Sequence, residues 1–138
     1  MKAICRAVLM GFALLALAAC AQEAKPASPK PLTFDALMKI VAQPGNTFFL
    51  DVREPSEIAE FGSLPGSVNI PLKQLESRLA EVPKGRPVLT MCQRGARAGL
   101  AAGLLESKGY TVVGAAGLRE VYDRAKDKLV FPKPEPKK

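Results

Sequence analysis

Short apolar runs and helix-like apolar spacings follow one another along this chain. Runs of β-branched, aromatic and other apolar residues predict strands, and apolar residues at three- and four-residue spacing predict helices. The predicted strands cover residues 47–50, 67–70, 87–91 and 111–113. The predicted helices cover the segment between Thr33 and Pro44 and residues 57–61, 72–81, 96–108 and 118–128. This alternation predicts an α/β fold, with a small parallel sheet flanked by helices on both faces.

Polar and glycine residues add details to the predicted helices. Thr33 and Ser56 are expected N-caps, because a hydroxyl there can accept a hydrogen bond from a backbone N–H of the first turn. Gly109 is expected to end the fourth helix in a left-handed conformation. The apolar side of that helix is expected to hold Leu100, Leu104 and Leu105. Gly99 and Gly103 are expected to let the same helix pack closely on the sheet.

The first 19 residues have the pattern of a signal peptide. Lys2 and Arg6 precede an apolar run, residues 7–19, which is too short to span a bilayer. The run ends in Leu-Ala-Ala-Cys20, which resembles the lipobox of bacterial lipoproteins, where the cysteine becomes lipidated. The alternative is an ordinary signal peptide that happens to be cleaved before a cysteine. We expect an exported protein with a lipid anchor at Cys20, attached to a membrane and facing the periplasm. Ala21 favours the outer membrane if the source is Gram-negative.

Composition divides the rest of the chain into three parts. Residues 20–31 contain the lipidated cysteine and a Pro- and Ala-rich flexible linker, and residues 132–138 form a basic tail expected to be disordered. Residues 32–131 remain as one small domain, with 13 Lys/Arg and 11 Asp/Glu, a net charge of +2 out of +7 for the whole chain. The basic charge therefore lies mainly outside the domain, where it favours an anionic membrane surface over a nucleic acid.

Residue types that are missing exclude several kinds of chemistry. The chain has no histidine, which excludes Ser-His-Asp and Cys-His catalysis and histidine-based metal sites. With the leader removed and Cys20 lipidated, Cys92 is the only free cysteine, so we expect no structural zinc, no other metal and no internal disulfide. An unpaired cysteine in an exported protein needs a reason. Cys92 is either a small apolar core residue or a nucleophile.

The position of Cys92 favours the nucleophile. Cys92 and Asp51 each stand at the carboxyl end of a predicted strand, the edge of a parallel sheet where reactive groups gather. The loop 93–97 and the helix that follows would direct backbone N–H groups and the positive end of the helix dipole at the sulfur. Gly95 can adopt the positive φ that such a loop needs. The sequence therefore predicts a stabilised thiolate at Cys92.

Three segments together resemble a known family. Asp-Val-Arg-Glu-Pro at 51–55, Pro-Gly-Ser-Val-Asn-Ile-Pro-Leu at 65–72 and the loop Cys-Gln-Arg-Gly-Ala-Arg at 92–97 resemble a single-domain rhodanese. The resemblance implies a sulfurtransferase with no metal or organic cofactor. Cys92 would take the outer sulfur of a small anionic donor such as thiosulfate, hold it as a persulfide, and pass it to a thiol or cyanide-like acceptor. We expect the protein to be a monomer.

The resemblance also implies roles for the loop residues. It makes Cys92 the catalytic residue and assigns persulfide binding to Gln93, Arg94, Gly95, Ala96 and Arg97. Arg94 either attracts the anionic donor or is a solvated surface charge. Arg97 either points to the ligand or forms an ion pair with Asp51 or a glutamate, and we favour the ion pair.

Residues outside the loop have supporting roles in this interpretation. Asp51 and Arg53 are expected to orient the loop, Asp51 as a hydrogen-bond acceptor. Arg53 is also expected to form a structural ion pair with Glu57 or Glu60 near the first turn. Ser63 stands where many members of the family have histidine, so we expect the function of that histidine to be absent.

The length of the loop indicates what it holds. Related phosphatases and arsenate reductases enclose a tetrahedral oxyanion in seven residues, whereas residues 92–97 close in six, which suits a single sulfur atom better. The remaining alternative is a rhodanese-like module that binds a partner or senses redox state without turnover.

Overall fold

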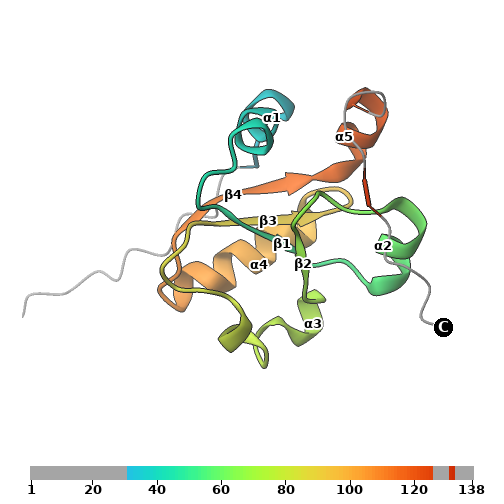
Figure 1. The fold of residues 1–138 in the computed structure, drawn as a ribbon. Helices are drawn as coiled ribbons and strands as arrows, with labels where there is room; N and C mark the ends of the chain where they lie inside the picture. Colours follow the sequence, from blue (N-terminus) through green and yellow to red (C-terminus); the bar gives the residue numbers. More distant parts are fainter. Residues whose placement is uncertain (1–30, 126–130, 133–138) are drawn as a thin grey trace, which may run out of the picture.

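A computed structural model describes residues 31–125 and 131–132 of the chain. Its centre is a four-stranded parallel sheet in the order β2-β1-β3-β4 (Figure 1). The strands are β1 (Phe48–Asp51), β2 (Val68–Asn69), β3 (Val88–Cys92) and β4 (Val112–Gly117). β1 and β3, the two central strands, are buried along their whole length. The predicted signal peptide, Cys20, the linker up to residue 30, and tail residues 133–138 lie outside the described residues.

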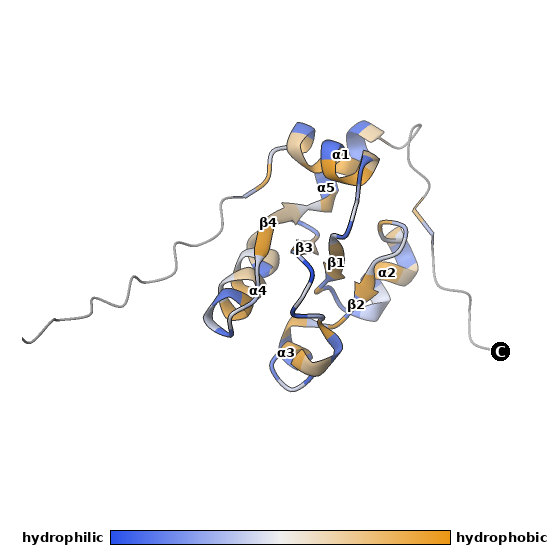
Figure 2. Cartoon of the chain, turned by 60° about the vertical axis from the view of Figure 1, so that its left-hand side comes forward, coloured by the Kyte–Doolittle hydropathy of each residue, from blue (hydrophilic) through white to orange (hydrophobic). Residues whose placement is uncertain are grey.

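Helices cover both faces of the sheet, as predicted. They are α1 (Phe34–Ala42), α2 (Pro55–Phe61), α3 (Leu72–Leu75), α4 (Ala96–Ser107) and α5 (Leu118–Ala125), with a 3-10 helix η1 (Leu79–Glu81). α1 and α5 lie on one side, and α3 and α4 on the other (Figure 1). Each side has its own apolar core against the sheet. Figure 2 shows hydrophobic colour on the strands between the two helix layers. Within the described residues, no helix has the length and apolar content needed to cross a bilayer.

The first described residues extend the sheet at its β4 edge. The backbone N–H of Leu32 donates to the carbonyl oxygen of Ala115 at 2.8 Å, and Pro31 forms an isolated parallel bridge to the same residue. β4 runs on to Gly117, four residues past the predicted strand end, because Gly114 to Gly117 pair with β3 although they lack β-branched side chains. The chain therefore enters the domain beside β4, at the outer edge of the sheet.

Helix ends are confirmed in two places and corrected in a third. The Thr33 side chain accepts a hydrogen bond from the Ala36 N–H at 3.3 Å, and Gly109 has a φ of 81°. Ser56 is not an N-cap. α2 begins at Pro55, and Glu54 caps it through a reciprocal pair in which Glu57 accepts from the Glu54 N–H at 3.1 Å. A proline at the first helical position suits this start, since its missing N–H would have no partner there.

The predicted helix over 72–81 is two short turns. α3 ends at Leu75, Arg78 leaves the helical region with φ −111° and ψ 18°, and η1 begins at Leu79. Leu75, Leu79 and Val82 nevertheless all contact the core on this side. These apolar residues therefore reach the core without a continuous helix.

The last predicted helix is confirmed up to Ala125, and residues 126–128 lie outside the described part.

The predicted apolar side of α4 is confirmed for Leu105 and Leu104 but not for Leu100. The buried residues of the helix are Ala98, Ala101, Ala102 and Leu105. Leu100 is 68% exposed, and Leu104 is partly buried. Gly99 and Gly103 have no other atom within 4 Å of where a Cβ would lie, so they do not provide the predicted close packing. The small alanine side chains bring α4 near the sheet instead, and this places the start of α4 at the end of β3.

Candidate active site

Cys92 ends β3, and its sulfur lies under the turn that begins α4. The Sγ atom accepts hydrogen bonds from the backbone N–H of Gly95 at 3.1 Å and of Ala98 at 3.4 Å. The side chain is 1% exposed, yet it forms part of the wall of a cavity of about 320 Å³. The other residues of this Cys92 cavity are Glu57, Gln93, Arg94, Ala96 and Arg97. The sulfur is therefore buried and still faces a space that a small reactant can enter.

The sulfur serves as the cap of α4. Gly95 is the N-cap residue, has a φ of 92° and has no side chain to accept from the first turn. The N–H groups at the start of a helix need acceptors, and the Cys92 sulfur accepts from Gly95 and from Ala98, the third helical residue. An anionic sulfur is the better acceptor for these donors and for the helix dipole. Gly95 behaves as predicted, whereas the sequence did not identify Ala98.

Arg97 forms an ion pair, as favoured, and its partner is Glu57. The guanidinium donates to the two carboxylate oxygens at 2.6 and 2.7 Å, linking α4 to α2. The hydrogen bond to Arg97 lowers the pKa of Glu57, and the same bond raises the pKa of Arg97. Both residues line the Cys92 cavity, and Glu57 neutralises the charge of Arg97 there. Arg94 lines the same cavity and is exposed.

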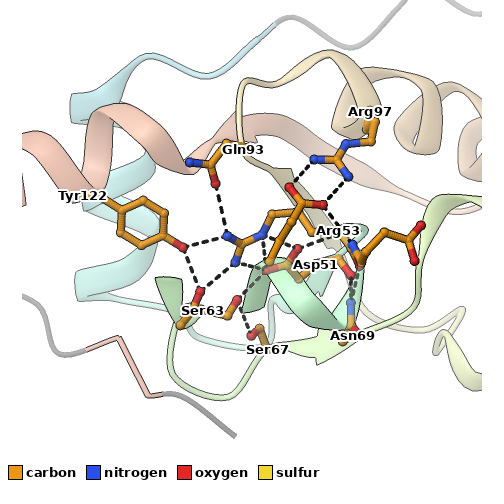
Figure 3. Close-up of polar contacts among 11 residues, drawn as sticks. Asp51, Arg53, Ser63, Ser67, Asn69, Gln93, Arg97 and Tyr122 are labelled. Atoms are coloured by element: carbon orange, nitrogen blue, oxygen red, sulfur yellow. Dashed lines mark hydrogen bonds and ion pairs between the residues drawn. The ribbon is translucent and has the colours of Figure 1, made fainter. Parts of the chain in front are cut away.

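Beneath the loop, Asp51 and Arg53 form a fully buried ion pair (Figure 3). The expected pairing of Arg53 with Glu57 or Glu60 is wrong. Arg53 donates from Nε and Nη2 to the Asp51 carboxylate at 3.0 and 2.6 Å, and Nη2 also donates to the Gly62 carbonyl oxygen at 2.8 Å. Burial alone would lower the pKa of Arg53, but the hydrogen bonds and charge of Asp51 outweigh it and raise that pKa. The two residues project to the same side because they lie two apart at a strand end.

This buried pair reaches the loop through Gln93. Nη1 of Arg53 donates to Gln93 Oε1 at 3.3 Å and to the Tyr122 hydroxyl at 2.9 Å (Figure 3). The Tyr122 hydroxyl in turn donates to the Gly62 carbonyl oxygen at 2.8 Å. Arg53 thus connects Asp51 to Gln93 of the loop, and the loop-orienting role of the two residues stays a prediction. The sequence did not identify Tyr122, although its place on the apolar side of α5, next to Val121, is a signal for a partly buried position.

Ser63 has a structural role that the sequence did not predict. Its hydroxyl donates to Asp51 Oδ2 at 2.6 Å and accepts from the Ser67 hydroxyl at 2.9 Å. Asn69 donates to the carbonyl oxygens of Asp51 and Arg53 at 2.9 and 2.8 Å, which fixes the end of β1. The residue in the histidine position therefore completes the hydrogen bonding of the buried carboxylate. Among the described residues, no three histidine, cysteine or acidic side chains are grouped to hold a metal ion.

The chain is similar in sequence to known proteins. Residues 33–122 match the Rhodanese-like domain family. A sulfurtransferase of Allochromatium vinosum is similar, with 33% identity over 76 residues, which cover 55% of this chain and 70% of that protein. The thiosulfate sulfurtransferase PspE of Escherichia coli is 37% identical over 76 residues, covering 53% of this chain and 72% of the other.

A solved structure with both sequence and fold similarity is that of reduced Bacillus anthracis CoADR-RHD. The identity is 33% and the TM-score 0.64, over 75% of this chain and 18% of that one. The family match, the relatives and the similar fold agree, and this chain belongs to the rhodanese family, with single-domain sulfurtransferases among its relatives.

Proposed function

We propose that the protein is a sulfurtransferase that moves a sulfane sulfur from thiosulfate or a persulfide to a thiol-type acceptor. The observation that carries this proposal is the Cys92 sulfur, which faces a cavity while two backbone N–H groups donate to it. Such donors favour the thiolate, which is the nucleophilic form of cysteine. The loop also closes in six residues, a size that suits one additional sulfur atom.

The reaction has two displacement steps. The Cys92 thiolate attacks the outer sulfur of thiosulfate, a bond forms between the two sulfurs, and sulfite leaves with the electron pair of the broken bond. The acceptor thiolate then attacks that outer sulfur, and the Cys92 thiolate leaves. Because Glu57 already neutralises Arg97, the exposed Arg94 is the cation of the Cys92 cavity that can attract an anionic donor. Neither step calls for a metal or an organic cofactor.

Incubation with thiosulfate tests this function. We expect the intact mass of the protein to increase by one sulfur atom, and the added mass to disappear when cyanide or a thiol is supplied. A mass that stays unchanged while the protein captures a partner would overturn the proposal and support a binding or redox-sensing module.

Gly117 is expected to be needed for the shape of the loop. It pairs with Cys92 across the sheet, and an added Cβ would lie 3.0 Å from the Arg94 carbonyl carbon and 3.2 Å from the Gly95 nitrogen. Gly117→Ala should therefore displace the N–H that donates to the sulfur, slowing persulfide formation by about tenfold or more and destabilising the fold by about 1–3 kcal/mol. Stopped-flow mixing with thiosulfate and urea unfolding measure the two effects.

Gly103→Ala is the matched control, because an added Cβ there meets no other atom within 4 Å. It should leave the rate of persulfide formation unchanged and slightly stabilise α4, since alanine favours a helix more than glycine does. Equal rates for the two variants would contradict a role for Gly117 in shaping the loop.

We also propose that the protein is exported as a monomer and anchored through lipid on Cys20, at the outer membrane if the source is Gram-negative. The charged start, apolar run and lipobox-like end of residues 1–20 support this location. Cys20→Ser should move the protein from the membrane fraction to the soluble one. An unchanged membrane fraction would refute the anchor without affecting the proposed chemistry.

A further inference from the structure

A second and larger cavity lies beside the Cys92 cavity. It has a volume of about 570 Å³, within the usual range for sites that bind small molecules. Its walls are the loop at Gln93 to Gly95, the end of β4, the start of α5, and the entering chain at Pro31 and Leu32. We call it the flanking cavity. Leu32 and Ala115 give it an apolar wall, and charged side chains of α5 and the loop provide the rest.

The two cavities have common walls. Gln93 and Arg94 line both of them, so these side chains form the boundary between the flanking cavity and the space around the sulfur. The backbone N–H of Arg119, at the start of α5, donates to the Gln93 carbonyl oxygen at 2.9 Å. This hydrogen bond connects Gln93, at the boundary, to the start of α5. A molecule bound in the flanking cavity would therefore lie next to the Cys92 cavity.

The charged side chains of the flanking cavity favour an anionic ligand. Arg124 is neutralised by Glu120 at 2.7 Å and stacks over the Phe34 ring at 4.0 Å. Within the described residues, Arg94, Arg119 and Asp123 of the lining take part in no ion pair, and all three are exposed, so the unpaired charges of the cavity sum to +1. Arginine is suited to carboxylates, which it can contact through two parallel hydrogen bonds. The cavity therefore offers a site for a carboxylate next to an apolar wall.

We propose that the flanking cavity binds the body of the sulfur acceptor, a small thiol that carries a carboxylate. This inference rests on the function proposed above and names the class of acceptor. The carboxylate lies against Arg119, and the sulfur extends past Gln93 to Cys92. The acceptor thiolate attacks the outer sulfur of the persulfide, a new sulfur–sulfur bond forms, and the bond to Cys92 breaks. The electron pair returns to Cys92 as a thiolate, so no oxidant or reductant is needed.

The test compares two acceptors of similar size on the persulfidated protein. The protein is first loaded with thiosulfate, freed of donor and checked by mass. Its discharge is then measured with 3-mercaptopropionate, which has a carboxylate, and with 2-mercaptoethanol, which has none. In Arg119→Gln the ratio of the half-saturating concentrations, 3-mercaptopropionate over 2-mercaptoethanol, should rise about tenfold. Glutamine keeps the backbone N–H that donates to Gln93, so the loop contact is preserved.

Lys73→Gln is the control, because it removes the same charge from an exposed position on α3, on the opposite side of the sheet (Figure 1). It should leave the ratio unchanged. If Arg119→Gln also leaves the ratio unchanged in a loaded protein, the inference is overturned and the proposed function stands. If the protein never gains the sulfur, the proposed function fails and this inference with it, and the mass shows that failure before any acceptor is added.

Discussion

Asp51→Ala is expected to lower the free energy of unfolding by about 3–5 kcal/mol. The substitution leaves the Arg53 guanidinium fully buried with its charge uncompensated, because Arg53 and Asp51 are both 0% exposed. It also removes the acceptor of the Ser63 hydroxyl. A loss of this size is a large part of the stability of a domain of about a hundred residues. Urea unfolding followed by circular dichroism measures it.

The double variant Asp51→Ala/Arg53→Met distinguishes charge burial from a general loss of packing. It leaves no buried charge without a partner, so its unfolding free energy should be closer to that of the unmodified protein than the value for Asp51→Ala. Glu81→Ala removes one partner of the exposed Arg78–Glu81 pair and should barely change the unfolding midpoint. A double variant less stable than Asp51→Ala would refute this explanation.

Cys92→Ser is expected to abolish sulfur transfer, with a rate at least about 10³-fold lower, while the protein stays folded. Loss of a nucleophile from an enzyme with a covalent intermediate has effects of this size or larger. The fold should persist because a serine hydroxyl is itself a good acceptor for the N–H groups at the start of a helix. It can therefore replace the sulfur as the cap of α4, but it cannot form a persulfide.

Two measurements test whether Cys92→Ser loses sulfur transfer and keeps its fold. Mass spectrometry after incubation with thiosulfate should show no added sulfur in Cys92→Ser, and the thermal unfolding midpoint should stay within a few degrees of the original. Transfer that persists in Cys92→Ser would mean that another group carries the sulfur. A variant that unfolds would mean that serine does not replace the cap.

Local signals predicted the parts of the site that depend on neighbouring residues. The strand end at Cys92 and the positive φ of Gly95 follow from short stretches of sequence. An ion pair of Arg97 was favoured, but its partner Glu57 lies 40 residues away and was not singled out. The partner of Arg53 was missed, because its full burial depends on Tyr122 and Gly62, which meet it only in the folded chain. A charged residue near a turn is usually solvated, so the expected partners were the exposed glutamates of α2.

The face of α4 was predicted only in part, for a different reason: Leu105 and Leu104 pack in the core, and Leu100 does not. Alanine, glycine and leucine occupy so many of its positions that the apolar spacing does not single out one side. The leucines seemed the natural core, but the end of β3 and the start of α4 are held close together by the bonds from Gly95 and Ala98 to Cys92. The small side chains of Ala98, Ala101 and Ala102 therefore face the sheet, Leu105 is buried in the last turn of the helix, and Leu100 is exposed.

Under the proposed lipid anchor, the hydrogen bond from Leu32 to Ala115 would limit how far the site can lie from the membrane. It holds the start of the domain in the wall of the flanking cavity, which the loop also lines. The twelve residues from Cys20 to Pro31 span at most about 40 Å when fully extended. Under the proposed lipid anchor, the opening above Cys92 would stay within a few tens of ångströms of the bilayer. The protein would then transfer sulfur close to the membrane surface, to acceptors that reach it there.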